Sequence, residues 1–220
     1  MHPTALQNAE RFFQAYATGR TGLAIAEIGS LDVNGSLRDS SPLGAQYVGL
    51  DFTPGKGVDV VLNDPYALPL PDASQDIVVS SSCFEHSQMF WLVFLEILRI
   101  LKSDGVFYMN APSNGPFHRY PVDCWRFYPD AAEALAAWGR RSGYPVVLLE
   151  SFTTMQSGGY FNDFVAVYLK DQQQIAKHPT RVLDRLATFT NGWAYGRDAM
   201  RNPQVLPEDQ RRLVEVGLLK

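Results

Sequence analysis

Successive apolar runs in this chain end in a glycine or a carboxylate, and residues of these types could bind a nucleoside. Gly29 follows the run from Leu23 to Ile28, and Asp51 follows the run from Tyr47 to Leu50. A glycine lets the backbone approach a ligand closely, and a carboxylate about 20 residues further on can accept hydrogen bonds from ribose hydroxyls. The pattern indicates a cofactor that contains a nucleoside, with an ordinary strand–helix–strand unit without a ligand as the alternative.

The spacing of the glycines favours some nucleoside cofactors over others. Ser30 stands beside Gly29 and the next glycine is Gly35, so the loop departs from the G-x-G-x-x-G pattern that binds a dinucleotide pyrophosphate. A dinucleotide is therefore the poorer fit, and a nicotinamide-dependent dehydrogenase is disfavoured without being excluded. Asp32, Asn34 and Gly35 predict a turn-rich loop, because these residue types tolerate a tight or left-handed backbone.

Further polar residues follow the third and fourth apolar runs. Asp64 and Pro65 follow the third run, and a carboxylate at that edge of a sheet suits the amino group of an adenine. The alternative for Asp64 is an Asx-turn before the proline. Ser81 opens the polar stretch after the fourth run, which leads to Glu85 and His86.

The stretch from Pro112 to Pro129 combines four prolines and several aromatic residues with a histidine, two arginines and an aspartate. Long loops in compact domains are usually functional or disordered, and the aromatic content argues against disorder. We interpret this loop as the wall that faces the acceptor substrate. Arg119 and Arg126 are candidates for binding a carboxylate or phosphate, and Tyr120 and Trp125 for lining the pocket. Arg126 could equally pair with an internal acid.

Three side chains could act as a general base toward an acceptor. His118 comes first, because an imidazole titrates nearest to neutrality and Asp123 could orient it. His86 and Asp123 are the other candidates for a catalytic role. The alternative for His118 is a hydrogen bond to the loop backbone. We predict no metal site, because the spacing of His86, His118 and Asp123 matches no ligand pattern.

The elements that must position these residues alternate as in a doubly wound, mostly parallel α/β sheet. Helical periodicity predicts helices over 4–18, 89–102 and 130–141, with Thr4 and Asp130 as candidate caps. Asp104 and Gly105 are expected to stop the second of these helices. Apolar runs predict strands over 23–28, 47–50, 58–62, 76–80, 106–111, 144–152 and 164–170. The last two strands are predicted to form an antiparallel hairpin, joined by the flexible residues 156–159.

Composition indicates one globular domain with an appendage. A chain of 220 residues with 46% hydrophobic residues can bury a sizeable core, and a net charge of −4 argues against a nucleic-acid partner. Cys83 and Cys124 lie far apart and are interpreted as reduced thiols of a cytoplasmic protein. No apolar run reaches membrane-spanning length, and the N-terminus has no secretory signal, so we expect no membrane partner.

The chain turns polar after residue 170. We predict a domain over 1–170 and a helical extension over 171–220, with helices over 182–189 and 207–218. The extension could cap the active site, form a homodimer contact or pack on the sheet, and the sequence leaves these roles open.

With these residues in view, residues 22–170 resemble the class I S-adenosylmethionine-dependent methyltransferases of the small-molecule type. The family's acid and glycines after the first strand are similar to Glu27, Gly29 and Gly35, and its acid after the second strand is similar to Asp51. The further matches are Asp64 after the third strand, LPLPDASQD over 68–76, Glu85-His86 after the fourth strand and LKSDG over 101–105.

The resemblance implies a Rossmann-like sheet of seven strands, mostly parallel with an antiparallel last strand, and helices on both faces. It implies S-adenosyl-L-methionine as the cofactor and a small molecule as the acceptor, preferably a hydroxyl of a sugar or secondary metabolite. An N- or C-methyltransferase and an inactive cofactor-binding partner subunit are the alternatives. The cofactor-binding residues that it implies are Glu27, Gly29, Ser30, Gly35, Asp51, Phe52, Asp64, Pro65 and Ser81.

Overall fold

The first half of the chain forms five parallel strands in the computed structural model, which describes residues 2–155, 160–204 and 213–218. The strands pair in the order β3-β2-β1-β4-β5, as the doubly wound α/β prediction requires. Their bounds are β1 (Ala24–Ile28), β2 (Gln46–Asp51), β3 (Val60–Val61), β4 (Gln75–Ser81) and β5 (Leu101–Pro112). Buried apolar side chains of β1, β4 and β5 face both sides of the sheet, which is typical of parallel strands covered on both faces.

Three antiparallel pairings complete the sheet. β7 (Asp163–Leu169) lies between β5 and β6 (Val147–Thr154) and is antiparallel to both, which confirms the predicted hairpin. β8 (Thr190–Ala194) then pairs antiparallel with β6, so the sheet has eight strands in the order β3-β2-β1-β4-β5-β7-β6-β8. The predicted α/β class and the helices on both faces are confirmed, whereas the predicted count of seven strands is too low by one.

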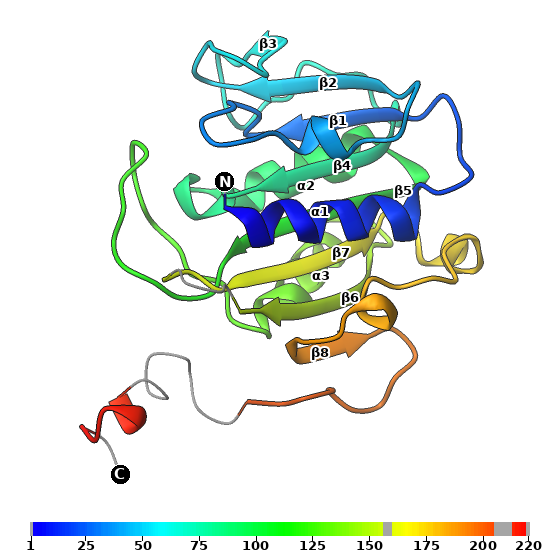
Figure 1. Cartoon of the computed structure of the whole chain (residues 1–220). Coiled ribbons are helices and arrows are strands. Elements are labelled where there is room, and N and C mark those ends of the chain that lie inside the picture. Colours follow the sequence, from blue (N-terminus) through cyan, green and yellow to red (C-terminus); the bar gives the residue numbers. More distant parts are fainter. Residues whose placement is uncertain (1, 156–159, 205–212, 219–220) are drawn as a thin grey trace.

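Helices cover the two faces unequally (Figure 1). α1 (Pro3–Tyr16) lies along one face, where Phe12, Phe13 and Tyr16 pack into a buried cluster with side chains of β4, β5 and β7. α2 (Phe90–Ile100) and α3 (Ala131–Arg141) cover the other face and contribute Phe94 and Leu135 to a second cluster. The sheet therefore has a separate apolar core on each side.

Several predicted helix ends differ from the structure. α1 begins at Pro3 after His2, and Thr4 lies inside it, because proline is well suited to the first helical turn. α2 ends at Ile100, and Asp104-Gly105 does not stop it, because Leu101 already begins β5 and pairs with Gln75 of β4. Asp130 precedes α3 but makes no capping hydrogen bond with its side chain.

The predicted C-terminal extension is largely not helical where the structure describes it. The predicted helix over 182–189 is replaced by one short 3₁₀ turn, η4 (Leu183–Arg185), and the stretch predicted to be a loop contains β8. An exposed edge of β6 can bind a further strand through its backbone, and 190–194 occupies that edge. In the predicted helix over 207–218, residues 207–212 lie outside the described residues, and 213–215 are helical. The linker 156–159 also lies outside them.

Two further 3₁₀ turns, η1 (Leu37–Ser40) and η3 (Gln172–Lys177), complete the connections, and η2 (Phe84–His86) follows β4 directly. β1, β2, β4 and β5 all end at one edge of the sheet, and the loop from 113 to 130 lies beside this edge (Figure 1).

Among the described residues, no helix has both the length and the apolar character needed to cross a membrane.

A buried carboxylate attaches the C-terminal segment to this sheet. Glu150 of β6 has no exposed surface, and its carboxylate accepts hydrogen bonds from the Tyr16 hydroxyl at 2.6 Å and from the backbone N–H groups of Val182 and Leu183 at 2.9 Å each. One side chain therefore joins α1, the sheet and η4. Each of these donors would be left buried without a partner if the carboxylate were removed.

We therefore expect Glu150→Ala to lower the free energy of unfolding by about 3 kcal/mol, because three buried donors lose their acceptor. Chemical denaturation monitored by circular dichroism measures this. The control is Glu133→Ala, which removes an exposed carboxylate paired with Arg140 and should cost no more than about 1 kcal/mol. Equal effects of the two variants would contradict the anchoring role of Glu150.

Candidate active site

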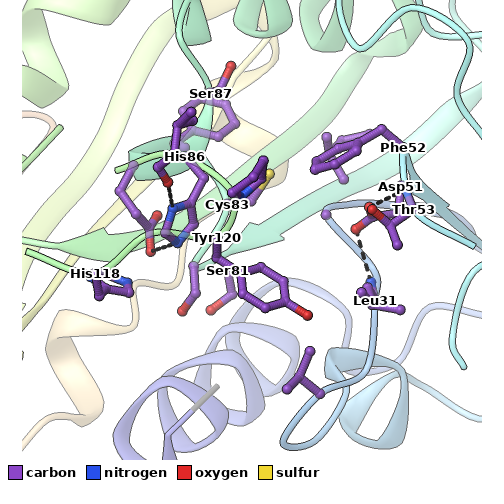
Figure 2. A pocket seen from close by; sticks show the side chains of 18 of the residues that line it. Leu31, Asp51, Phe52, Thr53, Ser81, Cys83, His86, Ser87, His118 and Tyr120 are labelled. Carbon is purple, nitrogen blue, oxygen red and sulfur yellow. Dashed lines mark hydrogen bonds and ion pairs between the residues drawn. The ribbon is translucent and has the colours of Figure 1, made fainter. Parts of the chain in front are cut away.

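A cavity of about 760 Å³ opens at the carboxyl edge of the parallel strands. Its lining comes from the loops after β1, β2 and β4, from residues 118–122 of the loop after β5, and from Tyr160 and Phe161 before β7. Figure 2 shows two groups of side chains, with Asp51, Phe52 and Thr53 on one side and His86, His118 and Tyr120 on the other. Ser81 and Cys83 lie between these groups (Figure 2).

Gly29 places the end of β1 directly against the loop that leaves β4. Its φ of +81° favours glycine, and a Cβ atom added there would lie 2.5 Å from Cys83 Cβ and 2.6 Å from Cys83 Sγ. The backbone N–H of Gly29 donates to Leu50 O at 2.9 Å, which ties the turn to the end of β2. Gly29 and Gly35, which the sequence predicts to bind the cofactor, both line the cavity.

Asp32 explains how the atypical loop between these glycines is held. Its carboxylate accepts from the N–H of Gly35 at 2.7 Å and lies 2.6 Å from Lys56 Nζ, and the ammonium group lowers the pKa of Asp32. The side chain closes the loop in the way that Asx-turn residues do. Ser30 is buried and lies outside the cavity lining, although we predicted a cofactor contact for it.

Asp51 stands at the end of β2 with its carboxylate in the cavity wall. It is 8% exposed and accepts hydrogen bonds from the backbone N–H of Leu31 at 3.2 Å and of Thr53 at 2.9 Å (Figure 2). Because a carboxylate offers about four acceptor positions, these two bonds leave room for ligand hydroxyls. Phe52 beside it lines the cavity with a half-exposed ring, so this side offers a carboxylate next to an aromatic face.

Two other predicted cofactor residues lie outside the lining. Glu27 is buried and accepts a hydrogen bond from the Tyr47 hydroxyl at 2.9 Å, and burial raises the pKa of Glu27 to about 7. Asp64 is exposed and accepts from the N–H of Tyr66 at 2.8 Å, which is the Asx-turn alternative. Pro65 and Ser81 do line the cavity.

The opposite side of the cavity brings two histidines together. The rings of His86 and His118 are 4.9 Å apart at their centroids and nearly perpendicular. His86 Nδ1 lies 2.5 Å from Val122 O, so this nitrogen carries the proton of the neutral ring and donates it. Burial lowers the pKa of His86 and favours this neutral form.

Asp123 contacts His118 and also forms an ion pair with Arg126. Asp123 accepts the backbone N–H of His118 at 2.7 Å, and its Oδ2 lies 3.3 Å from the His118 Nδ1 atom. Arg126 donates to both oxygens of Asp123, at 2.6 and 2.8 Å, and this pair lowers the pKa of Asp123 to about 2. Asp123 is therefore an anion at neutral pH and a poor base.

The predicted substrate residues divide into two groups. Arg119 and Tyr120 line the cavity, as expected for a wall that faces the acceptor. Arg126 lies outside the lining and pairs with Asp123, which is the alternative that the sequence left open. Trp125 also lies outside, because its Nε1–H donates to Ser87 O at 2.8 Å and its ring packs against Phe90.

Sequence reasoning missed several lining residues. Glu85 is 1% exposed, burial raises its pKa to about 8, and among the described residues nothing donates a hydrogen bond to its Oε2. The sequence marks Glu85 only as part of the Glu85-His86 pair after the fourth strand, and gives it no role in the site. His2 and Phe161 come from distant segments, and no motif marks them. Cys83 gave no signal either, since its contact with Gly29 is a property of the fold.

Glu85, His86 and His118 each offer one donor atom, and these three atoms lie within 4.8 Å of one another. The set weighed from the sequence contained Asp123 in place of Glu85. The structure uses Asp123 to hold Arg126 and His118, and brings Glu85 to the cluster from the turn after β4.

Residues 26–109 match the family model described as a methyltransferase domain. A search of curated protein sequences finds no match to the chain. One similar solved structure is the 1,6-didemethyltoxoflavin-N1-methyltransferase of Burkholderia thailandensis, with bound 1,6-didemethyltoxoflavin and S-adenosylhomocysteine. It has a TM-score of 0.60 and 14% identity over 76% of this chain and 79% of that chain.

Two further solved structures share the fold at 14% identity over 76% of this chain. The first is an N-methyltransferase from Haemonchus contortus in complex with phosphomonomethylethanolamine and S-adenosylhomocysteine (TM-score 0.52, 52% of that chain). The second is the cyclase SpnF (TM-score 0.54, 81% of that chain). Identities this low establish the common fold of these proteins with this chain, and no more than the fold.

Because a Cβ at Gly29 would overlap with Cys83, we expect a substitution there to cost more stability than backbone strain at positive φ alone would cause. Gly29→Ala should lower the free energy of unfolding by about 2 kcal/mol more than Gly143→Ala. Both glycines have positive φ, but a Cβ at Gly143 would meet nothing within 4 Å, so this control carries only the backbone strain. Thermal and urea denaturation compare the two, and equal losses would show that the contact with Cys83 is not tight.

Proposed function

We propose that this chain, which contains a methyltransferase domain over residues 26–109, transfers the methyl group of S-adenosylmethionine to a hydroxyl of a small molecule. The observation that carries the proposal is one cavity with a carboxylate and an aromatic ring at one side and an oriented histidine at the other. S-adenosylmethionine supplies a methyl group on a sulfonium, from which an acceptor displaces it in line.

The Asp51 side of the cavity fits the nucleoside of this cofactor. Gly29 lines the cavity in a turn where a Cβ would collide with Cys83, and Asp51 lies in the wall at the place where ribose hydroxyls are bound in such folds. Phe52, Leu62 and Tyr66 supply apolar surface beside it for the adenine. The protein's part in such a reaction is to position the reactants and exclude water.

The His118 side of the cavity fits an acceptor that must lose a proton. Asp123 lies 3.3 Å from His118 Nδ1, which leaves Nε2 as the nitrogen that can accept a proton. A general base of this kind typically accelerates a reaction by about 10² to 10⁴. Arg119 and Tyr120 lie beside it in the wall, where they can contact polar and aromatic parts of an acceptor.

A volume of about 760 Å³ lies within the range of pockets that bind small molecules, so we propose a small-molecule acceptor. Two similar structures are N-methyltransferases, which makes an amine the second candidate for the accepting group. The cyclase SpnF shows that this fold also serves other chemistry, so the activity must be measured directly.

Asp51→Ala should weaken S-adenosylmethionine binding by roughly 10- to 100-fold, because a charged acceptor for the ribose hydroxyls is lost. Isothermal titration calorimetry measures the affinity. Asp64→Ala is the matched control, since Asp64 also follows a parallel strand but lies outside the cavity, and it should bind as the wild type does.

Circular dichroism must show that both variants are folded, because Asp51 also accepts hydrogen bonds from Leu31 and Thr53. If the wild type did not bind S-adenosylmethionine at all, the proposed function would be wrong. Equal losses of S-adenosylmethionine affinity in the two variants would show that Asp51 does not bind the nucleoside.

His118→Asn should lower turnover by about 10²-fold or more and leave the affinity for S-adenosylmethionine unchanged. The assay is a screen of candidate alcohols and amines with methyl-labelled S-adenosylmethionine, and product NMR identifies the methylated atom. Tyr128→Phe is the control, because Tyr128 lies in the same loop, is exposed and does not line the cavity. Undiminished turnover in His118→Asn would refute the role of this histidine.

A further inference from the structure

Three potential metal ligands converge at the acceptor side of the cavity. Glu85 and His86 lie in η2, immediately after β4, and His118 lies in the loop after β5. One donor atom of each falls within 4.8 Å of the others, and the three residues line the cavity together. Figure 2 shows His86 and His118 on the same side of the cavity.

The Glu85 carboxylate is buried without sufficient partners. Its side chain is 2% exposed, Oε1 lies 3.7 Å from His86 Nε2, and among the described residues Oε2 has no hydrogen-bond donor. Buried polar atoms are normally satisfied. Asp163 Oδ2 is also without a partner among the described residues, but it lies outside the cavity lining, whereas the Glu85 oxygen lies beside two histidines that line the cavity. The Glu85 oxygen therefore points to a missing donor or cation at this place. The positive charge of Arg126 is already matched by its two-point pair with Asp123.

Hydrogen bonds assign the free nitrogen of each histidine. His86 Nδ1 donates to Val122 O, which leaves the lone pair of Nε2 toward Glu85. Arg126 Nη2 lies 3.4 Å from His118 Nδ1, but its two hydrogens are donated to the nearer Pro116 O and Asp123 Oδ2, each at 2.8 Å. His118 Nδ1 therefore carries its own proton toward Asp123 Oδ2 at 3.3 Å, and its Nε2 has the lone pair.

This arrangement is the one that metal-binding histidines adopt. One ring nitrogen donates to a carbonyl or a carboxylate and fixes the ring, and the other nitrogen is left to bind the cation. Here the fixing groups are Val122 O for His86 and Asp123 for His118. Two imidazoles with one carboxylate form a donor set that suits zinc and its transition-metal neighbours better than magnesium or calcium.

We propose that Glu85, His86 and His118 bind one divalent transition-metal cation, of which Zn²⁺ is the best fit, with an open coordination position toward the cavity. Ligand atoms at about 2.1 Å from a tetrahedral cation lie about 3.4 Å apart. Because the donor atoms lie up to 4.8 Å apart, the widest separation must shorten by up to about 1.4 Å. His118 can supply this movement, because its side chain is 38% exposed and lies in a loop.

The site itself depends only on these ligands, whereas its role rests on the proposed function. A cation there binds the acceptor's hydroxyl oxygen and lowers the pKa of that hydroxyl, and His118 then acts as a ligand in place of the base. The O–H bond breaks and its proton leaves to solvent through the open cavity. The oxygen then bonds to the methyl carbon while the carbon–sulfur bond breaks and its electron pair stays on sulfur.

The test uses the full chain without a histidine tag, stripped with a chelator and titrated with Zn²⁺ by calorimetry and with Co²⁺ by visible absorption. We expect one equivalent to bind. Glu85→Gln, His86→Asn and His118→Asn should each weaken binding by about 100-fold or more, and Asp123→Asn, which removes a positioning residue, by about 10- to 100-fold.

Cys124→Ser is the control, because Cys124 is an exposed thiol in the same loop and should not contribute. Its Zn²⁺ affinity should equal that of the wild type, and the Co²⁺ spectrum should lack a thiolate charge-transfer band. Since Glu85→Gln changes a buried group, His118→Asn is the decisive variant.

No binding by the wild type, unchanged binding by His118→Asn, or loss of binding in Cys124→Ser would each overturn the proposed site. The titration needs neither S-adenosylmethionine nor an acceptor. Metal binding without methyl transfer would count against the proposed function alone, and methyl transfer without metal binding would count against the cation alone.

Discussion

The contact of Gly29 with Cys83 determines the geometry of the whole cavity. It brings the turn after β1 so close to the loop after β4 that no Cβ fits between them, and it does so at the edge where the parallel strands end. The turn leads toward Asp51 through its hydrogen bond to Leu50 O, while Cys83 leads directly into the turn that carries Glu85 and His86. This contact acts together with the pairing of β1 with β2 and β4, which holds the Asp51 side and the histidine side of the cavity at the same edge of the sheet.

The buried carboxylates show how this protein usually stabilises an acid away from water. Asp123 has a two-point pair with Arg126, Glu150 accepts from a hydroxyl and two backbone N–H groups, and Glu27 accepts from the Tyr47 hydroxyl. Glu85 Oε2 and Asp163 Oδ2 differ, because neither has a hydrogen-bond partner among the described residues. Of these two acids only Glu85 lines the cavity and lies beside two histidines, so its free oxygen is the one that a bound cation would explain.

Apolar runs and their polar ends were enough to predict the parallel strands, the hairpin and the Asp51 side of the site, because these depend on local pattern and on the shared edge of a parallel sheet. The differences have two causes. Asp64 and Arg126 have partners close by in the sequence, and the structure uses them in place of a ligand. The other cause is contact between distant segments. β8 forms because β6 offers an open edge, and Glu85 joins the histidines because β4 and β5 end side by side. Neither relationship is visible in a window of sequence.

In the proposed reaction, the cluster of Glu85, His86 and His118 also bears on which atom would receive the methyl group. An amine nitrogen has one lone pair, so a cation that binds it would block its attack on the methyl carbon. A hydroxyl oxygen has a second lone pair and remains a nucleophile while it is bound, and it gains more from losing its proton. A base at His118 likewise helps an alcohol most, because an alcohol is the weaker nucleophile before deprotonation. Whether Nε2 of His118 holds a proton or a cation, the chemistry of this cluster favours oxygen over nitrogen as the acceptor.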